Sequence, residues 1–92
     1  MKIKSQEVGM HGLMISTEEC FNEVCSGGDR LKKLTKECEC VYPDPNGLYQ
    51  MLLYLTPEER NKAYAKACEL GFESAAVVAQ LVYVDTKYLR GK

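Results

Sequence analysis

The chain has 92 residues, of which 46% are hydrophobic and 27% are charged. This length and composition predict a single globular domain over residues 1–92 and exclude both a second core and a disordered chain. Twelve basic and 13 acidic residues give a formal net charge of −1. No global field therefore attracts or mimics nucleic acid, and any partner must be recognised through local patches.

Targeting signals are not found in the sequence. No run approaches the ~18 apolar residues of a membrane span, and residues 1–7 lack the apolar segment of a signal peptide. The cysteines number five, and an odd number without a signal peptide indicates reduced thiols. We therefore expect a cytoplasmic protein without a membrane partner.

Residues 1–16 are predicted to be extended, as a β-hairpin or two short strands around a turn at residues 9–12. Ser16 and Glu19 then have the spacing of a capping box, which predicts a helix from about residue 17 to 26. The helical period places three residues of this segment on one apolar face: Phe21, Val24 and Cys25.

A β-hairpin is predicted over residues 37–55. Alternation with a period of two begins at Glu37 and would place Cys38, Cys40 and Tyr42 on one face of a strand. The run Pro-Asp-Pro-Asn-Gly at residues 43–47 is a strong turn signal, and a Leu- and Tyr-rich segment follows it.

The C-terminal third is predicted to form a helical hairpin. Thr56, Pro57 and Glu59 are typical of a helix start, which predicts a helix over residues 57–70 that Gly71 would end. Ser74 would cap a second helix over residues 74–89. Residues 77–84 would also suit a buried strand, and we favour a helix because the segment is long and contains no glycine or proline.

Together these elements predict an α+β fold. An antiparallel sheet of three to four strands would carry the N-terminal helix and the C-terminal helical hairpin on it.

Two functional alternatives follow from local patterns. The spacing of Ala67 and Gly71 matches a DNA-binding helix-turn-helix, although the second helix would offer mainly alanine and valine where base-reading side chains are needed. Four cysteines also invite a zinc site, although their spacings are not those of typical zinc knuckles. These cysteines are Cys20, Cys25, Cys38 and Cys40.

The densest basic segment lies at residues 29–36, where a short helix is expected. It follows the Gly27–Gly28 loop, which would let a backbone approach a partner closely, and its cations could contact phosphates or an acidic protein surface. No nucleotide-binding, nucleophile or metalloprotease motif occurs, so we expect neither an enzyme nor a cofactor. The candidate partner-binding residues are Asn22, Asp29, Arg30, Lys32, Lys33 and Lys36, with Asn46 at the turn between Tyr42 and Tyr49.

Three features of the chain together indicate a family resemblance. They are the short basic start at residues 1–4, the compact α+β layout, and the loop 27–30 that leads into Lys32 and Lys33. The chain resembles the small phage-encoded inhibitors of bacterial defence, in particular the anti-CRISPR proteins that bind type I surveillance complexes. The resemblance implies a viral protein, active in the cytoplasm of a bacterial host, that binds Cas subunits near the guide RNA and blocks target DNA. Direct contact with the RNA is left open.

Overall fold

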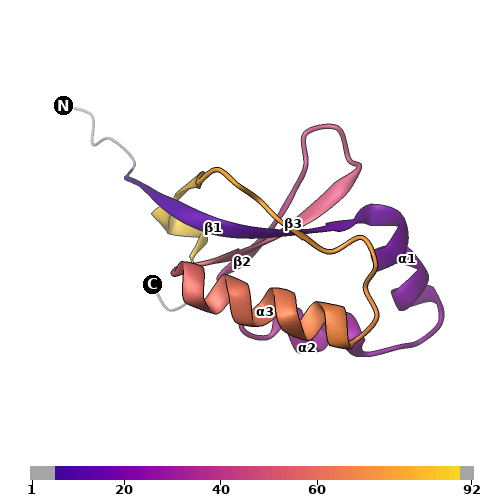
Figure 1. Ribbon diagram of the computed structural model, residues 1–92. Helices are drawn as coiled ribbons and strands as arrows, with labels where there is room; N and C mark the ends of the chain where they lie inside the picture. The colour runs from indigo at the N-terminus through magenta and orange to yellow at the C-terminus, as the bar shows by residue number, and fades with distance from the viewer. Residues whose placement is uncertain (1–5, 90–92) are drawn as a thin grey trace.

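The computed structural model describes residues 6–89, which form an α+β fold with one antiparallel five-stranded sheet and three α-helices. The helices lie on one side of the sheet (Figure 1). The elements in chain order are β1 Glu7–Ser16, α1 Thr17–Cys25, α2 Arg30–Thr35, β2 Cys40–Pro43, β3 Tyr49–Tyr54, α3 Pro57–Glu69, β4 Ala76–Val77, β5 Val82–Asp85 and a 3-10 turn, η1, Thr86–Tyr88.

β1 is the strand on which the sheet is built. On one edge it pairs with β3, from His11 opposite Tyr54 to Ser16 opposite Tyr49, and β2 continues the sheet beyond β3. On its other edge it pairs with β4 at its C-terminal half and with β5 at its N-terminal half. Backbone bonds to the carbonyls of Gly12 and Gln6 place both short strands on this same edge.

The predicted turn at residues 9–12 is wrong, because residues 7–16 form one continuous strand. Its glycines instead permit a close approach. A Cβ atom at Gly12 would lie 3.0 Å from Cγ2 of Val78, and one at Gly9 would lie 3.0 Å from Cδ1 of Leu81. The segment that joins β4 to β5 therefore packs directly on β1 where the strand carries no side chain. The rest of that prediction, residues 1–5, lies outside the described residues.

The predicted helices at residues 17–26 and 57–70 are confirmed, as is the hairpin, whose strands are β2 and β3. The first strand begins only at Cys40, and Cys38 and Cys40 pack on opposite faces of the sheet, so the face predicted for Cys38, Cys40 and Tyr42 is wrong. The hydroxyl of Thr56 accepts from the Glu59 N–H at 3.1 Å and caps α3. Gly71 has φ +92° and ends it, and the Phe72 N–H returns to the Ala67 carbonyl.

The predicted second helix at residues 74–89 is wrong. This segment contains β4, β5 and η1, so the C-terminal helical hairpin does not form. Ser74 caps no helix and instead bonds to the start of α1. The edge of β1 offers hydrogen-bond partners to the β-branched residues of this segment, and their side chains pack well on a sheet.

Two hydrophobic clusters fill the two faces of the sheet, because successive side chains of a strand point to opposite faces. Leu52 faces the helices and Leu53 faces the other side. The helix-side cluster includes Leu13, Ile15, Leu34, Leu52, Tyr54, Ala63, Ala67 and Phe72, and the second cluster contains Met10, Leu53, Val84 and Leu89.

We expect Leu53→Ala to lower the free energy of unfolding by about 2–5 kcal/mol, because it leaves a cavity in the second cluster. Leu48→Ala is the matched control, since that leucine is 62% exposed and its loss should change the free energy by less than about 0.5 kcal/mol. Urea unfolding measures both. Equal losses for the two variants would mean that the second face holds no core.

Candidate functional site

An apolar hollow of about 310 Å³ lies between α1, α2 and the β2–β3 hairpin. Phe21 and Val24 on α1 are each 66% exposed, and Val41 on β2 is 45% exposed, although all three are large and apolar. Exposed apolar surface gathered in one place marks an interaction site more often than scattered single residues do. The lining residues are Thr17, Cys20, Phe21, Val24, Leu31, Thr35, Val41, Gln50 and Leu52.

A second hollow of about 250 Å³ shares Val24, Leu31 and Thr35 with the first and continues to the Gly27–Gly28 loop and Lys32. We call the two hollows together the α1–α2 groove. Lys32 is the one charged side chain among the described residues that line it. The groove is therefore apolar along most of its length and basic at one end.

The apolar face predicted for the first helix exists, but it points outward. Phe21, Val24 and Cys25 are all exposed, whereas Cys20 and Glu23 are the buried residues of α1. An apolar helix face ordinarily packs on the core. Here the orientation of the helix is determined by a buried carboxylate, which has its partner on the next helix.

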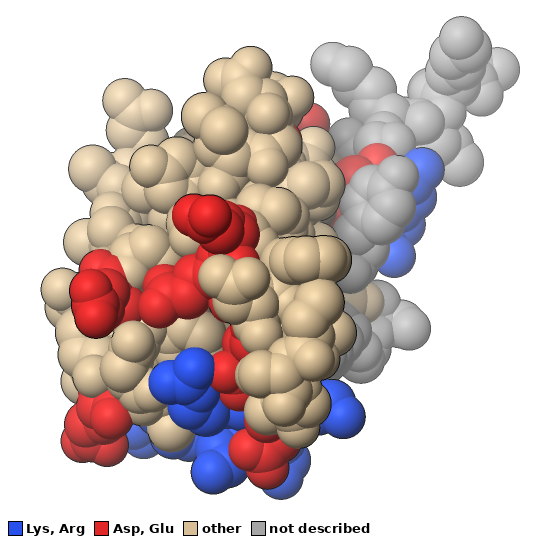
Figure 2. Space-filling view, turned by 90° about the vertical axis from the view of Figure 1, so that its right-hand side faces the viewer, with Lys and Arg blue, Asp and Glu red and all other residues tan. Residues whose placement is uncertain are grey.

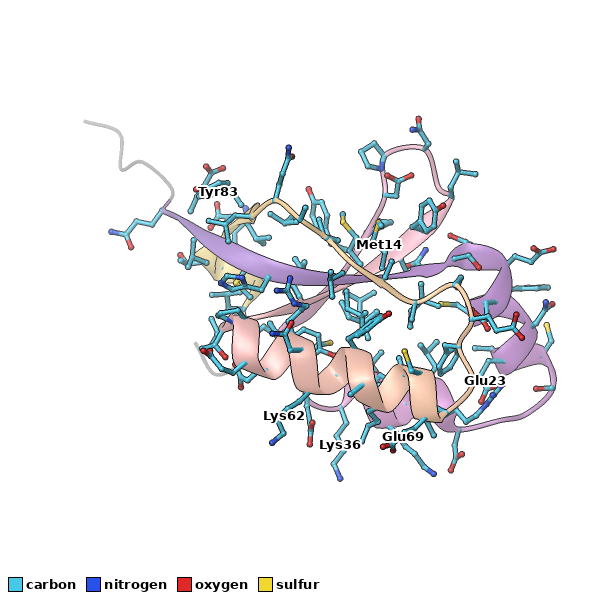
Figure 3. All side chains as sticks on the ribbon, in the orientation of Figure 1. Met14, Glu23, Lys36, Lys62, Glu69 and Tyr83 are labelled. Carbon is cyan, nitrogen blue, oxygen red and sulfur yellow. The ribbon has the colours of Figure 1, made fainter. Side chains whose placement is uncertain are left out.

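Glu23 is 3% exposed, and both of its carboxylate oxygens are bonded by Arg30. Oε2 accepts from the Arg30 backbone N–H at 2.8 Å, and Oε1 accepts from Nε at 2.9 Å and from Nη2 at 2.6 Å. These side-chain and backbone hydrogen bonds from Arg30 lower the pKa of Glu23. The pair fixes α1 against the start of α2 at the end of the molecule marked by Glu23 in Figure 3.

Arg30 reaches α3 as well. Its Nη1 donates to the Leu70 carbonyl, and its guanidinium carbon lies 5.0 Å from the centre of the Phe72 ring. Arg30, one of the predicted partner-binding residues, is 44% exposed, but its guanidinium is bonded within the molecule and joins three helices. Gly28 completes the arrangement, because a Cβ atom there would collide with the Glu23 carboxylate.

A second carboxylate on α1 holds the chain that follows α3. Glu19 accepts from the backbone N–H groups of Glu73 at 3.0 Å and Ser74 at 3.1 Å, and it also bonds the Ser74 hydroxyl. Partial burial raises the pKa of Glu19, but the hydrogen bonds from Ser74 and Glu73 outweigh it and lower that pKa. The Ser16 N–H donates to the same hydroxyl at 3.0 Å.

The other predicted partner-binding residues do not form one surface. Lys32 borders the α1–α2 groove, and the exposed Asn22 follows Phe21 on α1. Lys33 lies instead beside Lys62 and Lys66, around a separate hollow of about 170 Å³ between α2 and α3.

Three more predicted residues lie away from the groove lining. Lys36 extends from the helical layer away from the sheet, as does Lys62 (Figure 3). Asp29 precedes α2, where its carbonyl accepts from the Lys33 N–H. Asn46 lies in the β2–β3 turn, which projects on the other side of the sheet (Figure 1).

Figure 2 shows the end of the molecule that carries α1. Its upper part is mostly uncharged, acidic side chains cross its middle, and basic side chains gather along its lower edge with acidic ones among them. This face thus exposes charged side chains of both signs below an uncharged upper part.

The two alternatives from the sequence lose their structural basis among residues 6–89. No helix follows Gly71 that could read a DNA groove. No group of three or more His, Cys, Asp or Glu residues in this range could hold a metal ion. Burial raises the pKa of the Cys20 and Cys40 thiols, which makes them weaker nucleophiles at neutral pH.

Comparison with protein-family models, with curated proteins and with solved structures found no match to the chain. Within residues 6–89, no helix is both long and apolar enough to cross a bilayer.

We expect Gly28→Ala to lower the free energy of unfolding by about 1–3 kcal/mol, because the new methyl group overpacks the Glu23 carboxylate. A double-mutant cycle with Glu23→Ala, followed by urea unfolding, measures the coupling. The same substitution at Gly28 should cost less when Glu23 is absent. An unchanged cost would place the strain elsewhere.

The stability of the fold should decrease in acid. The pKa values of Glu19 and Glu23 are lowered in the folded state. Their contribution is therefore complete above the ordinary glutamate pKa of about 4.3 and is lost as the pH falls through the lower folded values. Thermal unfolding between pH 7 and 2 measures this loss.

Two variants and a control test whether Glu19 and Glu23 cause the loss of stability in acid. Glu19→Gln and Glu23→Gln should each reduce the slope of stability against pH, because each removes one of the two carboxylates. Glu18→Gln, at an exposed position on the same helix, should leave the slope unchanged. A slope that survives in both of the first two variants would contradict the assignment.

Proposed function

We propose that the chain is a non-enzymatic protein that binds a partner protein through the α1–α2 groove and inhibits it. The observation that carries the proposal is the exposure of Phe21, Val24 and Val41 around one apolar hollow. Burying such side chains against a partner contributes about 1.5–3 kcal/mol each when burial is complete. Lys32, one of the predicted partner-binding residues, lines the second hollow of the groove.

In its specific form, which the resemblance of the sequence suggests, the proposal names the target as a type I CRISPR surveillance complex. In this form the groove would cover part of a Cas subunit, and Lys33 and Lys36 would face acidic groups or the guide RNA. A small chain that occupies such a surface acts stoichiometrically and needs no catalytic residue. The groove supports protein binding, and the identity of the target rests on the resemblance.

A pull-down tests the proposal. The tagged chain is incubated with a bacterial lysate that contains type I complexes, and bound proteins are identified by mass spectrometry. We expect Cas subunits with the native chain and at least a tenfold lower recovery with Phe21→Asp/Val24→Asp, because charged groups would enter the apolar contact (about 1.4 kcal/mol per tenfold change). Lys32→Glu/Lys33→Glu should also reduce recovery.

Tyr83→Asp is the matched control, because Tyr83 is 61% exposed and lies at the opposite end of the sheet from Glu23 (Figure 3). It should recover as much Cas protein as the native chain. Recovery of nucleic acid without Cas protein would refute the CRISPR surveillance complex as the target. Equal recovery with the α1 variant and with the control would refute the groove as the contact surface.

A further inference from the structure

The strand that borders the α1–α2 groove limits what can occupy it. Val41 lies on β2, the edge strand of the sheet, and its side chain lines the groove. The Asp44 N–H donates to the Tyr49 carbonyl, and Tyr42 lies opposite Met51 in the same register. Even-numbered residues of β2 therefore direct their backbone groups to β3, and Val41 and Pro43 direct theirs to the free edge.

This edge offers very few partners to an added strand. Pro43 has no N–H group, and the N–H of Glu39 already donates to the Leu53 carbonyl. Val41 is then the one residue of β2 with both backbone groups directed to the free edge. An extended segment in the groove would leave most of its own backbone groups without partners, which is costly away from water.

A helix avoids that cost, because its backbone groups bond within the helix. It can present a stripe of apolar side chains at positions i, i+3 or i+4, and i+7. The two hollows of the groove adjoin, since both are lined by Val24, Leu31 and Thr35. Side chains on successive turns could enter the two hollows.

The charge at the end of the groove favours an occupant of opposite charge. Lys32 is the one charged residue among the described lining residues, and Arg30, which begins the same helix, forms an ion pair with Glu23. An acidic side chain at the end of the apolar stripe would meet Lys32, whereas a basic one would be repelled. A nucleic-acid strand would find one cation and one aromatic ring here, too few for backbone contact and stacking.

We propose that the α1–α2 groove binds an acidic amphipathic helix, with apolar side chains in the two hollows and a carboxylate facing Lys32. The inference rests on the proposed protein-binding function and names the segment that the partner contributes. It does not depend on the partner being a CRISPR complex.

A selection with displayed peptides tests this inference. A phage-displayed library of random peptides long enough for about four helical turns is panned on the immobilised full chain and depleted on Phe21→Asp/Val24→Asp. We expect the enriched peptides to carry apolar residues at helical spacing with flanking Asp or Glu. Peptides with alternating apolar residues, peptides rich in Lys or Arg, or no enrichment over the variant would each overturn the proposal.

Binding of an enriched peptide is then measured by fluorescence anisotropy. Phe21→Ala should weaken it about tenfold or more, and Lys32→Glu about two- to fivefold, because that ion pair is exposed. Tyr83→Asp should leave it unchanged, and circular dichroism confirms that each variant is folded. Equal affinity for the native chain and for Phe21→Ala would refute the groove as the binding site.

The two experiments fail in different ways. Selected helices that bind the groove, together with a pull-down that recovers no Cas protein, would keep this inference and remove the CRISPR target. Recovery of Cas protein that depends on Phe21 and Val24, together with a selection that yields strands or basic peptides, would keep the proposed function and remove the acidic helix.

Discussion

The pairing of Glu23 with Arg30 is the constraint on which the arrangement of the helices depends. A carboxylate that is almost fully buried needs its charge and its lone pairs satisfied, and Arg30 satisfies both oxygens from the start of α2. The same guanidinium bonds the end of α3 and covers the Phe72 ring. Removal of Arg30 would leave the buried Glu23 carboxylate without its partner, which is costly.

The groove is a geometric consequence of this pair. Residues of a helix are separated by about 100°, so a helix that turns Cys20 and Glu23 toward the core must turn Phe21 and Val24 away from it. The two leucines of α2 also face different sides, since Leu34 is buried and Leu31 lines the groove. The molecule thus keeps a formed apolar surface beside the sheet, and a partner of the kind we propose would lose less entropy on binding to it than to a surface that must first order.

Long-range contacts also decide the C-terminal part of the fold. β1 supplies one edge to β3 and the other to β4 and β5, and Gly9 and Gly12 let the connecting segment lie against it. Glu19 holds the chain just before β4 through the backbone N–H groups of Glu73 and Ser74. The segment is therefore held by partners that lie more than fifty residues away in the chain.

The sequence by itself determined the elements whose signals are local: the capped helices α1 and α3, the short α2 and the β2–β3 hairpin with its turn. Its choice of Lys32 as a partner-binding residue stays a prediction. Only the tertiary structure decided that residues 76–77 and 82–85 are strands, that Phe21 and Val24 face outward, and that Arg30 bonds to other parts of the same chain. The physical reason is that caps and turns bond to residues within a few positions. Strand pairing, the side of a helix that is buried and the partner of a buried charge depend on residues distant in the chain.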